Sequence, residues 1–297
     1  MQKIALFDNL AVSRIAYGLW RSTDDPDQSS NHLQQKIEAC LQQGITTFDQ
    51  ADIYGGYTAE TLLGRTLKKA PQLRDQMQII SKCNIVAPTG IHSDKRVKHY
   101  NSSQPYITRA VDRSLQEMAI ERIDLLLLHR PDPLMDADQT GAALDTLVTS
   151  GKVKTIGVSN FRPWDFELLQ SRTKNTLVTN QIEISLGQNS AFTNGDLAYM
   201  QQHGITPMAW SPLSGGQLFQ NPQSPLATKL QAIADNQNVA ATSVAIAWLL
   251  AHPAKILPIM GSNNIQHIKQ FSQALQVKLD RQSWFELLQA ANGQAVA

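Results

Sequence analysis

Residues 123–159 of the chain read IDLLLLHRPDPLMDADQTGAALDTLVTSGKVKTIGVS. Two short apolar runs, at 123–129 and 153–159, flank a stretch with helical spacing at 137–150. Each run is apolar through most of its length and ends in a polar residue, which is typical of parallel strands buried on both faces. This stretch therefore predicts a strand, a crossover helix and a second strand parallel to the first.

The same unit recurs along the whole chain. Apolar runs that predict strands lie at 14–18, 45–49, 78–82, 123–129, 153–159, 177–181, 205–210 and 255–260. Helical patterns lie at 29–43, 58–69, 104–119, 137–150, 163–171, 194–203 and 281–292. Gly44 and Gly204 stand between a helix and a strand, and Pro105 and Pro163 stand where a first helical turn should begin. About eight such units in 297 residues predict an α/β fold, a (β/α)8 TIM barrel that forms a single domain over residues 1–297.

An open, doubly wound sheet is the competing architecture. Such a fold usually carries a glycine-rich phosphate-binding turn after its first strand. Here the first strand continues as YGLWRSTDD (17–25), which has no G-x-G-x-x-G pattern. The barrel is therefore favoured. Two connections after strands, 83–103 and 211–240, are longer than the others, and we expect them to be loops on the active face.

The composition limits the classes of partner. The chain has 26 Lys and Arg against 25 Asp and Glu, so nothing indicates binding to nucleic acid or to an acidic membrane. No apolar run approaches the roughly 18 residues of a membrane span, and the first residues do not read as a signal peptide. The two cysteines are too few for a disulfide framework, and Cys83 is expected to be a buried structural thiol. We expect a reduced, cytoplasmic protein that is a monomer or a weak homo-oligomer.

Polar residues follow several predicted strands, at the end where (β/α)8 barrels carry their active sites. The second strand ends in Asp49 with Tyr54 just beyond it, the third ends in Lys82, and the fourth ends in His129. Each residue alone has an ordinary explanation as a helix cap, a turn or the first exposed residue after a strand. Four ionisable groups on one rim are harder to explain, because burying them costs several kcal/mol unless they pair. They are the candidate catalytic residues.

These four groups suggest one kind of chemistry. The tyrosine side chain has a pKa of about 10, too high for an effective acid or base near neutrality. A lysine ammonium nearby would lower the pKa of Tyr54, and Asp49 would keep that lysine charged. His129 could bond the same substrate oxygen or relay a proton. The set suits protonation of an oxygen that gains negative charge during hydride transfer.

A metal site has less support. His129 and Asp49 do not make the three protein ligands that a hydrolytic zinc needs. His92 and His99 lie in a long connection without ligand-like spacing. We expect no metal, and a metal-assisted hydrolase is the weakest function considered.

Four further motifs carry a family resemblance. FDQADIYGG (48–56), IDLLLLHRPDP (123–133), GKVKTIGVSNF (151–161) and NQIEISL (180–186) resemble signatures of the aldo-keto reductases, in the order found in that family. The run HRPDPLMDAD (129–138) resembles a bacterial branch of oxidoreductases whose natural substrates are generally not assigned. The resemblance covers essentially the whole chain.

The resemblance implies NAD(P)H-dependent reduction of aldehydes or ketones, with a catalytic tetrad of Asp49, Tyr54, Lys82 and His129 and with Tyr54 as general acid. It also implies a nicotinamide cofactor extended across the barrel mouth. The residues that match cofactor contacts in the family are Gly18, Leu19 and Trp20 beside the nicotinamide, Ser159, Asn160 and Gln181 at the carboxamide, Trp210 stacked on the ring, and Ser211, Pro212, Leu213 and Gly216 at the pyrophosphate. Asp49 is a further candidate cofactor contact.

The segment MGSNNIQHIKQF (260–271) supplies the remaining candidate cofactor contacts, Gly261, Ser262, Asn264 and Gln270. Backbone N–H groups at a helix start can hold an anion, but GSNN is equally well explained as a turn and a cap. NADP-specific members usually carry Lys or Arg here. The corresponding positions look like Gly261, Asn263 and His267, and Lys269 is only nearby, which weakens the case for a strong NADPH preference. The family resemblance still favours NADPH, with NADH possible.

The substrate is expected to be a small or medium carbonyl compound. The connection after His129 is short, and little chain follows 281–292, whereas family members with enclosed pockets elaborate both segments. A rather open site follows. The alternative function is a regulatory subunit that binds a nicotinamide cofactor with little turnover.

Overall fold

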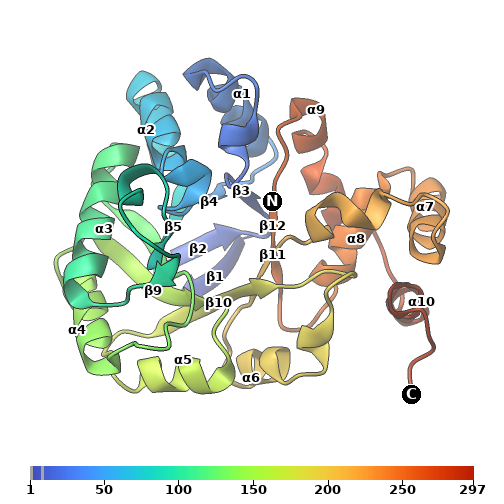
Figure 1. Cartoon of the computed structure of the whole chain (residues 1–297). Coiled ribbons are helices and arrows are strands. Elements are labelled where there is room, and N and C mark those ends of the chain that lie inside the picture. Colours follow the sequence, from blue (N-terminus) through green and yellow to red (C-terminus); the bar gives the residue numbers. More distant parts are fainter. Residues whose placement is uncertain (1–2, 8–9) are drawn as a thin grey trace.

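The computed structural model describes residues 3–7 and 10–297, and its centre is a closed barrel of eight parallel strands (Figure 1). In barrel order from the first, the strands are β3 (Ala16–Gly18), β4 (Thr47–Asp49), β5 (Gln78–Cys83), β8 (Ile123–Leu128), β9 (Val153–Ser159), β10 (Leu177–Glu183), β11 (Met208–Trp210) and β12 (Leu257–Met260). β12 pairs with β3, with Ile259 opposite Ala16, which closes the barrel. The predicted (β/α)8 architecture and all eight predicted strands are confirmed.

Helices surround the strands, as Figure 1 shows. They are α1 (Ser30–Leu41), α2 (Ala59–Lys69), α3 (Gln104–Met118), α4 (Ala137–Thr149), α5 (Pro163–Gln170), α6 (Asp196–Gln202), α7 (Pro225–Gln237), α8 (Ala241–Leu250), α9 (Ile265–Ile268) and α10 (Arg281–Asn292). The predicted helices α1 to α6 and α10 are confirmed, with ends within two residues. Pro105 and Pro163 occupy the first turns of α3 and α5, and Gly44 and Gly204 have positive φ between a helix and a strand.

The run of four leucines in β8 shows why the strands read as continuously apolar. Leu125 and Leu127 pack inside the barrel, whereas Leu126 and Leu128 pack in the layer between the strands and the helices. Side chains alternate between the two faces of a strand, and both faces of this strand are buried. The polar residues that follow the strands are thereby brought to one rim.

The N-terminal hairpin was not predicted. It consists of β1 (Lys3–Phe7) and β2 (Leu10–Ser13), which pair antiparallel. Leu10 and Val12 are buried in the same cluster as the inward-facing residues of the barrel strands. The hairpin therefore contributes to the interior of the barrel.

The two long connections are more regular than expected. Residues 83–103 contain a short hairpin of β6 (Ile85–Val86) and β7 (His99–Tyr100). Residues 211–240 contain a 3-10 segment (Ser214–Phe219) and α7, whose first turn has the side chain of Ser224 as its cap. The following helix α8 was also missed, because ATSVAIAWLL is apolar on every side and shows no helical period.

Two further expectations concern the whole chain. None of the helices in residues 3–7 and 10–297 combines the length and apolar character needed to cross a bilayer. Both cysteines are free and buried, and Cys83 packs in the layer between strands and helices, as predicted. Burial raises the pKa of the Cys83 thiol well above its ordinary value, which keeps it protonated and unreactive.

Candidate active site

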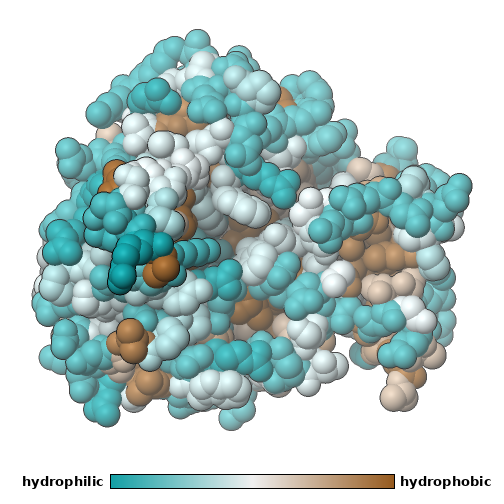
Figure 2. Space-filling model, viewed as in Figure 1, coloured by the Kyte–Doolittle hydropathy of each residue, from teal (hydrophilic) through white to brown (hydrophobic). Residues whose placement is uncertain are grey.

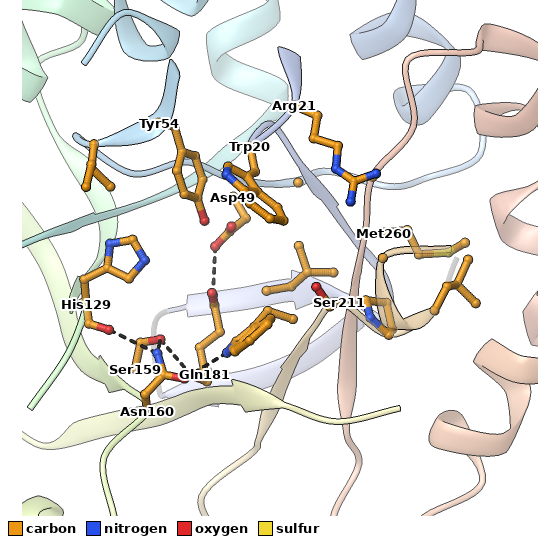
Figure 3. Close-up of a pocket in the computed structure, with 18 of the residues that line it drawn as sticks. Trp20, Arg21, Asp49, Tyr54, His129, Ser159, Asn160, Gln181, Ser211 and Met260 are labelled. Carbon is orange, nitrogen blue, oxygen red and sulfur yellow. Dashed lines mark hydrogen bonds between the residues drawn. The ribbon is translucent and has the colours of Figure 1, made fainter. Parts of the chain in front are cut away.

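A pocket of about 490 Å³ opens at the carboxyl ends of the barrel strands (Figure 3). Seen from the same side as Figure 1, the surface around it is mainly hydrophilic (Figure 2). The predicted site residues that line it are Gly18, Trp20, Asp49, Tyr54, His129, Ser159, Asn160, Gln181, Trp210, Ser211, Pro212, Leu213, Gly216, Gly261 and Ser262. Residues from every barrel strand end except that of β5 therefore meet in one cavity, and the β5 residue Lys82 lies just behind its wall.

Lys82 is the centre of the predicted catalytic group. Its side chain is fully buried, and Nζ donates to Asp49 Oδ2 at 2.8 Å, to the backbone oxygen of Gln50 at 2.9 Å and to Tyr54 Oη at 2.9 Å. An ammonium group has three N–H donors, so these bonds use all of them. Burial disfavours the charged form of Lys82, but Asp49 and Tyr54 outweigh it and raise the pKa of the lysine.

The hydroxyl of Tyr54 can donate a hydrogen bond into the pocket. Because Tyr54 Oη accepts a hydrogen bond from Lys82, its own O–H must point elsewhere, and the hydroxyl lies at the pocket wall. Lys82 lowers the pKa of Tyr54, as expected, but the pKa is raised on balance. Burial raises the pKa of Tyr54 by more than Lys82 lowers it, and Asp49 adds to the increase. The phenol is therefore protonated, which is the form that a general acid needs.

Asp49 connects this group to the far side of the barrel. Its second oxygen, Oδ1, accepts a hydrogen bond of 2.8 Å from Gln181 Nε2. Asp49 and Gln181 are 2% exposed, so the bond lies at the buried floor of the pocket. Gln181 is thus fixed by the carboxylate that holds Lys82.

His129 follows β8 and lies beside Tyr54, with ring centroids 6.0 Å apart. Burial, together with the positive charges of Lys82, Arg130 and Lys98, holds its pKa well below the ordinary value. The imidazole is therefore neutral near pH 7. Its Nδ1 has no hydrogen-bond partner among the described residues. A neutral imidazole can donate one hydrogen bond to a substrate oxygen without being the proton source.

A group of amides and hydroxyls covers the next part of the pocket floor. Ser159 Oγ donates to the Gln181 backbone oxygen at 2.7 Å, and Asn160 Nδ2 donates to the His129 backbone oxygen at 3.1 Å. Trp210 Nε1 donates to Asn160 Oδ1 at 3.0 Å, so the indole is held at the pocket wall. These side chains are ordered by each other before any ligand binds.

Three predicted contacts do not reach the pocket. Leu19 is only 1% exposed and packs in the core between strands and helices, because the chain turns its neighbour Trp20 outward. Asn264 is exposed and caps α9 by accepting from the backbone N–H of Gln266. Gln270 is exposed and lies beyond that helix. The cap explanation of the GSNN segment fits Asn264.

Several pocket residues were missed. Arg21, Lys98 and Arg130 line the pocket, and none forms an ion pair with a residue that the structure describes. Arg130 directly follows His129, and Lys98 lies in the long connection after the third strand, so their predicted position on the active face was a usable signal for both. Nothing in the sequence distinguishes Arg21. Among the described residues, no three His, Cys, Asp or Glu side chains are grouped so that they could hold a metal ion.

Comparison with known proteins bears on this geometry. The profile of the Aldo/keto reductase family matches residues 14–292. The chain belongs to the aldo/keto reductase family. The resemblance inferred from the sequence motifs is confirmed, and the protein is an enzyme for NAD(P)H-dependent reduction of carbonyl groups.

Individual aldo-keto reductases are similar over the full chain. A 6-dehydroglucose reductase of Agrobacterium fabrum is 60% identical over 297 residues, which cover 100% of both chains. The thermostable aldo-keto reductase Tm1743, crystallised with the inhibitor epalrestat, has a TM-score of 0.82 at 25% identity, covering 98% of this chain and 100% of that one. An aldo-keto reductase of Klebsiella pneumoniae, crystallised with NADPH, has a TM-score of 0.80 at 24% identity, covering 98% and 94%.

Proposed function

We propose that the protein reduces a polyhydroxylated aldehyde with NADPH and that Tyr54 gives the proton to the carbonyl oxygen. One observation carries the proposal. One of the three N–H groups of Lys82 donates to Tyr54 Oη. Because this oxygen accepts from Lys82, the phenolic proton points toward the pocket. No structural role requires a buried ammonium to be bonded to a tyrosine hydroxyl in a cavity.

The described residues fit a nicotinamide dinucleotide. Ser159, Asn160 and Gln181 present amide and hydroxyl groups at the floor, and the flat Trp210 side chain stands beside them. Gly215 and Gly216 have positive φ and no side chain. The backbone N–H groups of Ser214 and Gly216 bond within the turn, which leaves those of Leu213 and Gly215 to meet an anion. We propose that these residues hold the nicotinamide and the pyrophosphate. The reduced cofactor, when bound, supplies the hydride.

The side chains then have separate tasks. Tyr54 protonates the oxygen that becomes negative, and Lys82 stabilises the phenolate that Tyr54 leaves behind. Asp49 keeps Lys82 charged after the transfer. Neutral His129 orients the substrate oxygen by a hydrogen bond. These tasks need no rearrangement, because the bonds among Tyr54, Lys82 and Asp49 exist already.

The substrate class comes from the relative and from the pocket rim. The enzyme that is 60% identical is named for 6-dehydroglucose, an aldehyde with several hydroxyl groups. Lys98 and Arg130 offer N–H donors without an acidic partner on the His129 side of the pocket, and the ring of Trp20 lies 6.4 Å from that of Tyr54. Hydroxyl groups on the substrate would satisfy these donors, and the Trp20 ring would cover its apolar face.

Titration with NADPH and with NADH, followed by quenching of Trp fluorescence, tests the proposal. Trp20 and Trp210 both line the pocket, so saturable quenching is expected. Turnover of 6-dehydroglucose and of simple aldehydes is then measured with the better cofactor. Tight binding without turnover of any aldehyde would favour the regulatory-subunit function. Absence of binding by both cofactors would contradict the proposal.

A further inference from the structure

Lys36 is a fully buried lysine that the reductase chemistry does not use. It lies on α1, is 1% exposed, and forms an ion pair with Asp25, which is itself buried. Asp25 also bonds His32 Nε2 at 3.1 Å and the backbone N–H of Asp27 at 3.0 Å. A buried ion pair adds little net stability over apolar residues of the same size. We therefore ask which other groups Lys36 orients.

The second partner of Lys36 is Asn263, 227 residues further along the chain. Lys36 Nζ donates to Asn263 Oδ1 at 3.0 Å. Because an ammonium can only donate, the amide of Asn263 must present its oxygen to Lys36 and its NH2 group to the other side. There, Asn263 Nδ2 donates to the backbone oxygen of Arg21 at 2.8 Å. Lys36 therefore fixes the direction of this amide.

Asn263 joins two neighbouring segments at the pocket, which follow the paired strands β3 and β12. Segment 20–25 carries Trp20 and Arg21, and segment 261–264 carries Gly261, Ser262 and Asn263 itself, all of which line the cavity. Figure 3 shows Arg21 on the side of the pocket away from His129, with Trp20 between Arg21 and Tyr54. The second segment is anchored once more from behind, since Tyr17 Oη donates to the Ser262 backbone oxygen at 2.9 Å.

We propose that Asn263, oriented by Lys36, is a latch between segments 20–25 and 261–264 and controls how fast the cofactor leaves. The inference rests on the proposed function, since it takes the dinucleotide to occupy the pocket that both segments line. Lys36 is a positioning residue in this account, because it acts through Asn263. Asn263 is half-buried and contributes no apolar packing to the core, so its loss affects the latch more than the fold.

Stopped-flow displacement of NADPH from the full chain tests the latch. Asn263→Ala should raise the dissociation rate roughly tenfold, as the loss of a charge-assisted hydrogen bond predicts. Asn263→Asp should behave in the same way, because a carboxylate still accepts from Lys36 but cannot donate to Arg21. Lys36→Met should have a similar effect, and the double variant Lys36→Met/Asn263→Ala should add little to either single one.

A matched control and an independent readout complete the design. Asn189 also joins two segments, bonding the Leu186 backbone oxygen and Asn292, but it lies outside the pocket, so Asn189→Ala should leave dissociation unchanged. Hydrogen exchange of the cofactor-free protein should show faster exchange in 20–25 and 261–264 for Asn263→Ala. Since that variant spares the buried ion pair, its thermal midpoint should stay close to that of the wild type.

The outcomes separate the two proposals. Wild-type binding of NADPH with unchanged dissociation in Asn263→Ala and Lys36→Met would overturn the latch and leave the reductase proposal standing. A wild type that binds neither nicotinamide cofactor would overturn the proposed function and, with it, the role of the latch in cofactor release.

Discussion

The two ends of the pocket are built in different ways. At one end, Asp49, Lys82 and His129 come from the ends of barrel strands or directly after one, and Tyr54 follows in a short 3-10 turn. At the other end, the pocket is lined by residues of three segments that follow strands, 20–25, 211–216 and 261–264. The first end is held by the buried bonds of Lys82 with Asp49 and Tyr54. At the second end, the buried pair of Lys36 and Asp25 lies behind the wall, and the amide of Asn263 bonds one segment to the next. We call them the rigid end and the adjustable end, and we expect the chemistry at the first and cofactor exchange at the second.

The largest expected effect is at the rigid end. Lys82→Met should lower kcat by roughly 10²–10⁴-fold, because Tyr54 loses the charge that stabilises its phenolate. It should also lower the free energy of unfolding by about 3–5 kcal/mol, since Asp49 is left buried without its ammonium partner. Steady-state kinetics and urea unfolding measure the two effects.

The control for this variant separates stability from catalysis. Asn in place of Asp49 removes the stranded charge and can still accept the hydrogen bond from Gln181. The double variant Lys82→Met/Asp49→Asn should therefore recover most of the unfolding free energy but none of the activity. Recovery of both would show that Lys82 serves the fold alone.

His129 gives the next largest effect. His129→Gln should lower kcat by about 10²-fold, the usual cost of losing one donor to a developing oxyanion. A smaller loss, below a few-fold, would mean that the imidazole does not touch the substrate oxygen.

His129 also makes stability depend on pH. Its folded-state pKa is well below the ordinary value of 6.5, so between these two pKa values only the unfolded chain binds a proton at this site. The free energy of unfolding should fall as the pH is lowered through about 6.5. His129→Gln should lack this part of the decrease. Urea unfolding of both proteins at several pH values measures the difference, and parallel curves would contradict it.

Substitution of the cationic side chains that line the pocket near His129 should change KM moderately. Arg130→Gln and Lys98→Gln should each raise KM for 6-dehydroglucose roughly tenfold, as loss of a charged hydrogen-bond donor predicts. KM for an aldehyde without hydroxyl groups and the affinity for NADPH should not change. Equal effects on both aldehydes would place these side chains elsewhere in the mechanism.

The smallest effect concerns the adjustable end. Segment 261–267 has no Lys or Arg, so the wild type should prefer NADPH over NADH only modestly. His267→Arg should increase this preference by up to about tenfold by adding a charge-assisted contact to the 2′-phosphate. Fluorescence titration with both cofactors measures the ratio. An unchanged ratio would show that the 2′-phosphate does not lie near this residue.

The rigid end could be predicted from the sequence, because the alternation of side chains along a strand and the burial of both strand faces determine it. The leucine run of β8 and the polar residue after it follow from strand alternation and from burial on both faces. The parallel register then brings Asp49, Lys82 and His129 to one rim without further information. The bond between Gln181 and Asp49 was not readable, because it depends on side chains meeting across the closed barrel.

The adjustable end could be predicted only in part, because it too depends on contacts between residues far apart in the chain. Leu19 and Trp20 are neighbours, yet one is buried and the other 53% exposed, and which one faces the pocket depends on how β3 leaves the barrel. The contact of Lys36 with Asn263 joins residues far apart in the chain, and nothing in either local sequence indicates it. Helix α8 was missed because its environment, not its periodicity, makes it a helix.

The most direct test of the central claim is the single-turnover rate of NADPH oxidation by Tyr54→Phe with saturating 6-dehydroglucose, measured together with the affinity for NADPH. The phenylalanine keeps the ring but removes the proton donor that Lys82 orients. We predict a rate lower by roughly 10²–10⁴-fold with nearly unchanged NADPH affinity. A Tyr54→Phe enzyme that retains most of the wild-type rate would contradict the assignment of Tyr54 as the general acid.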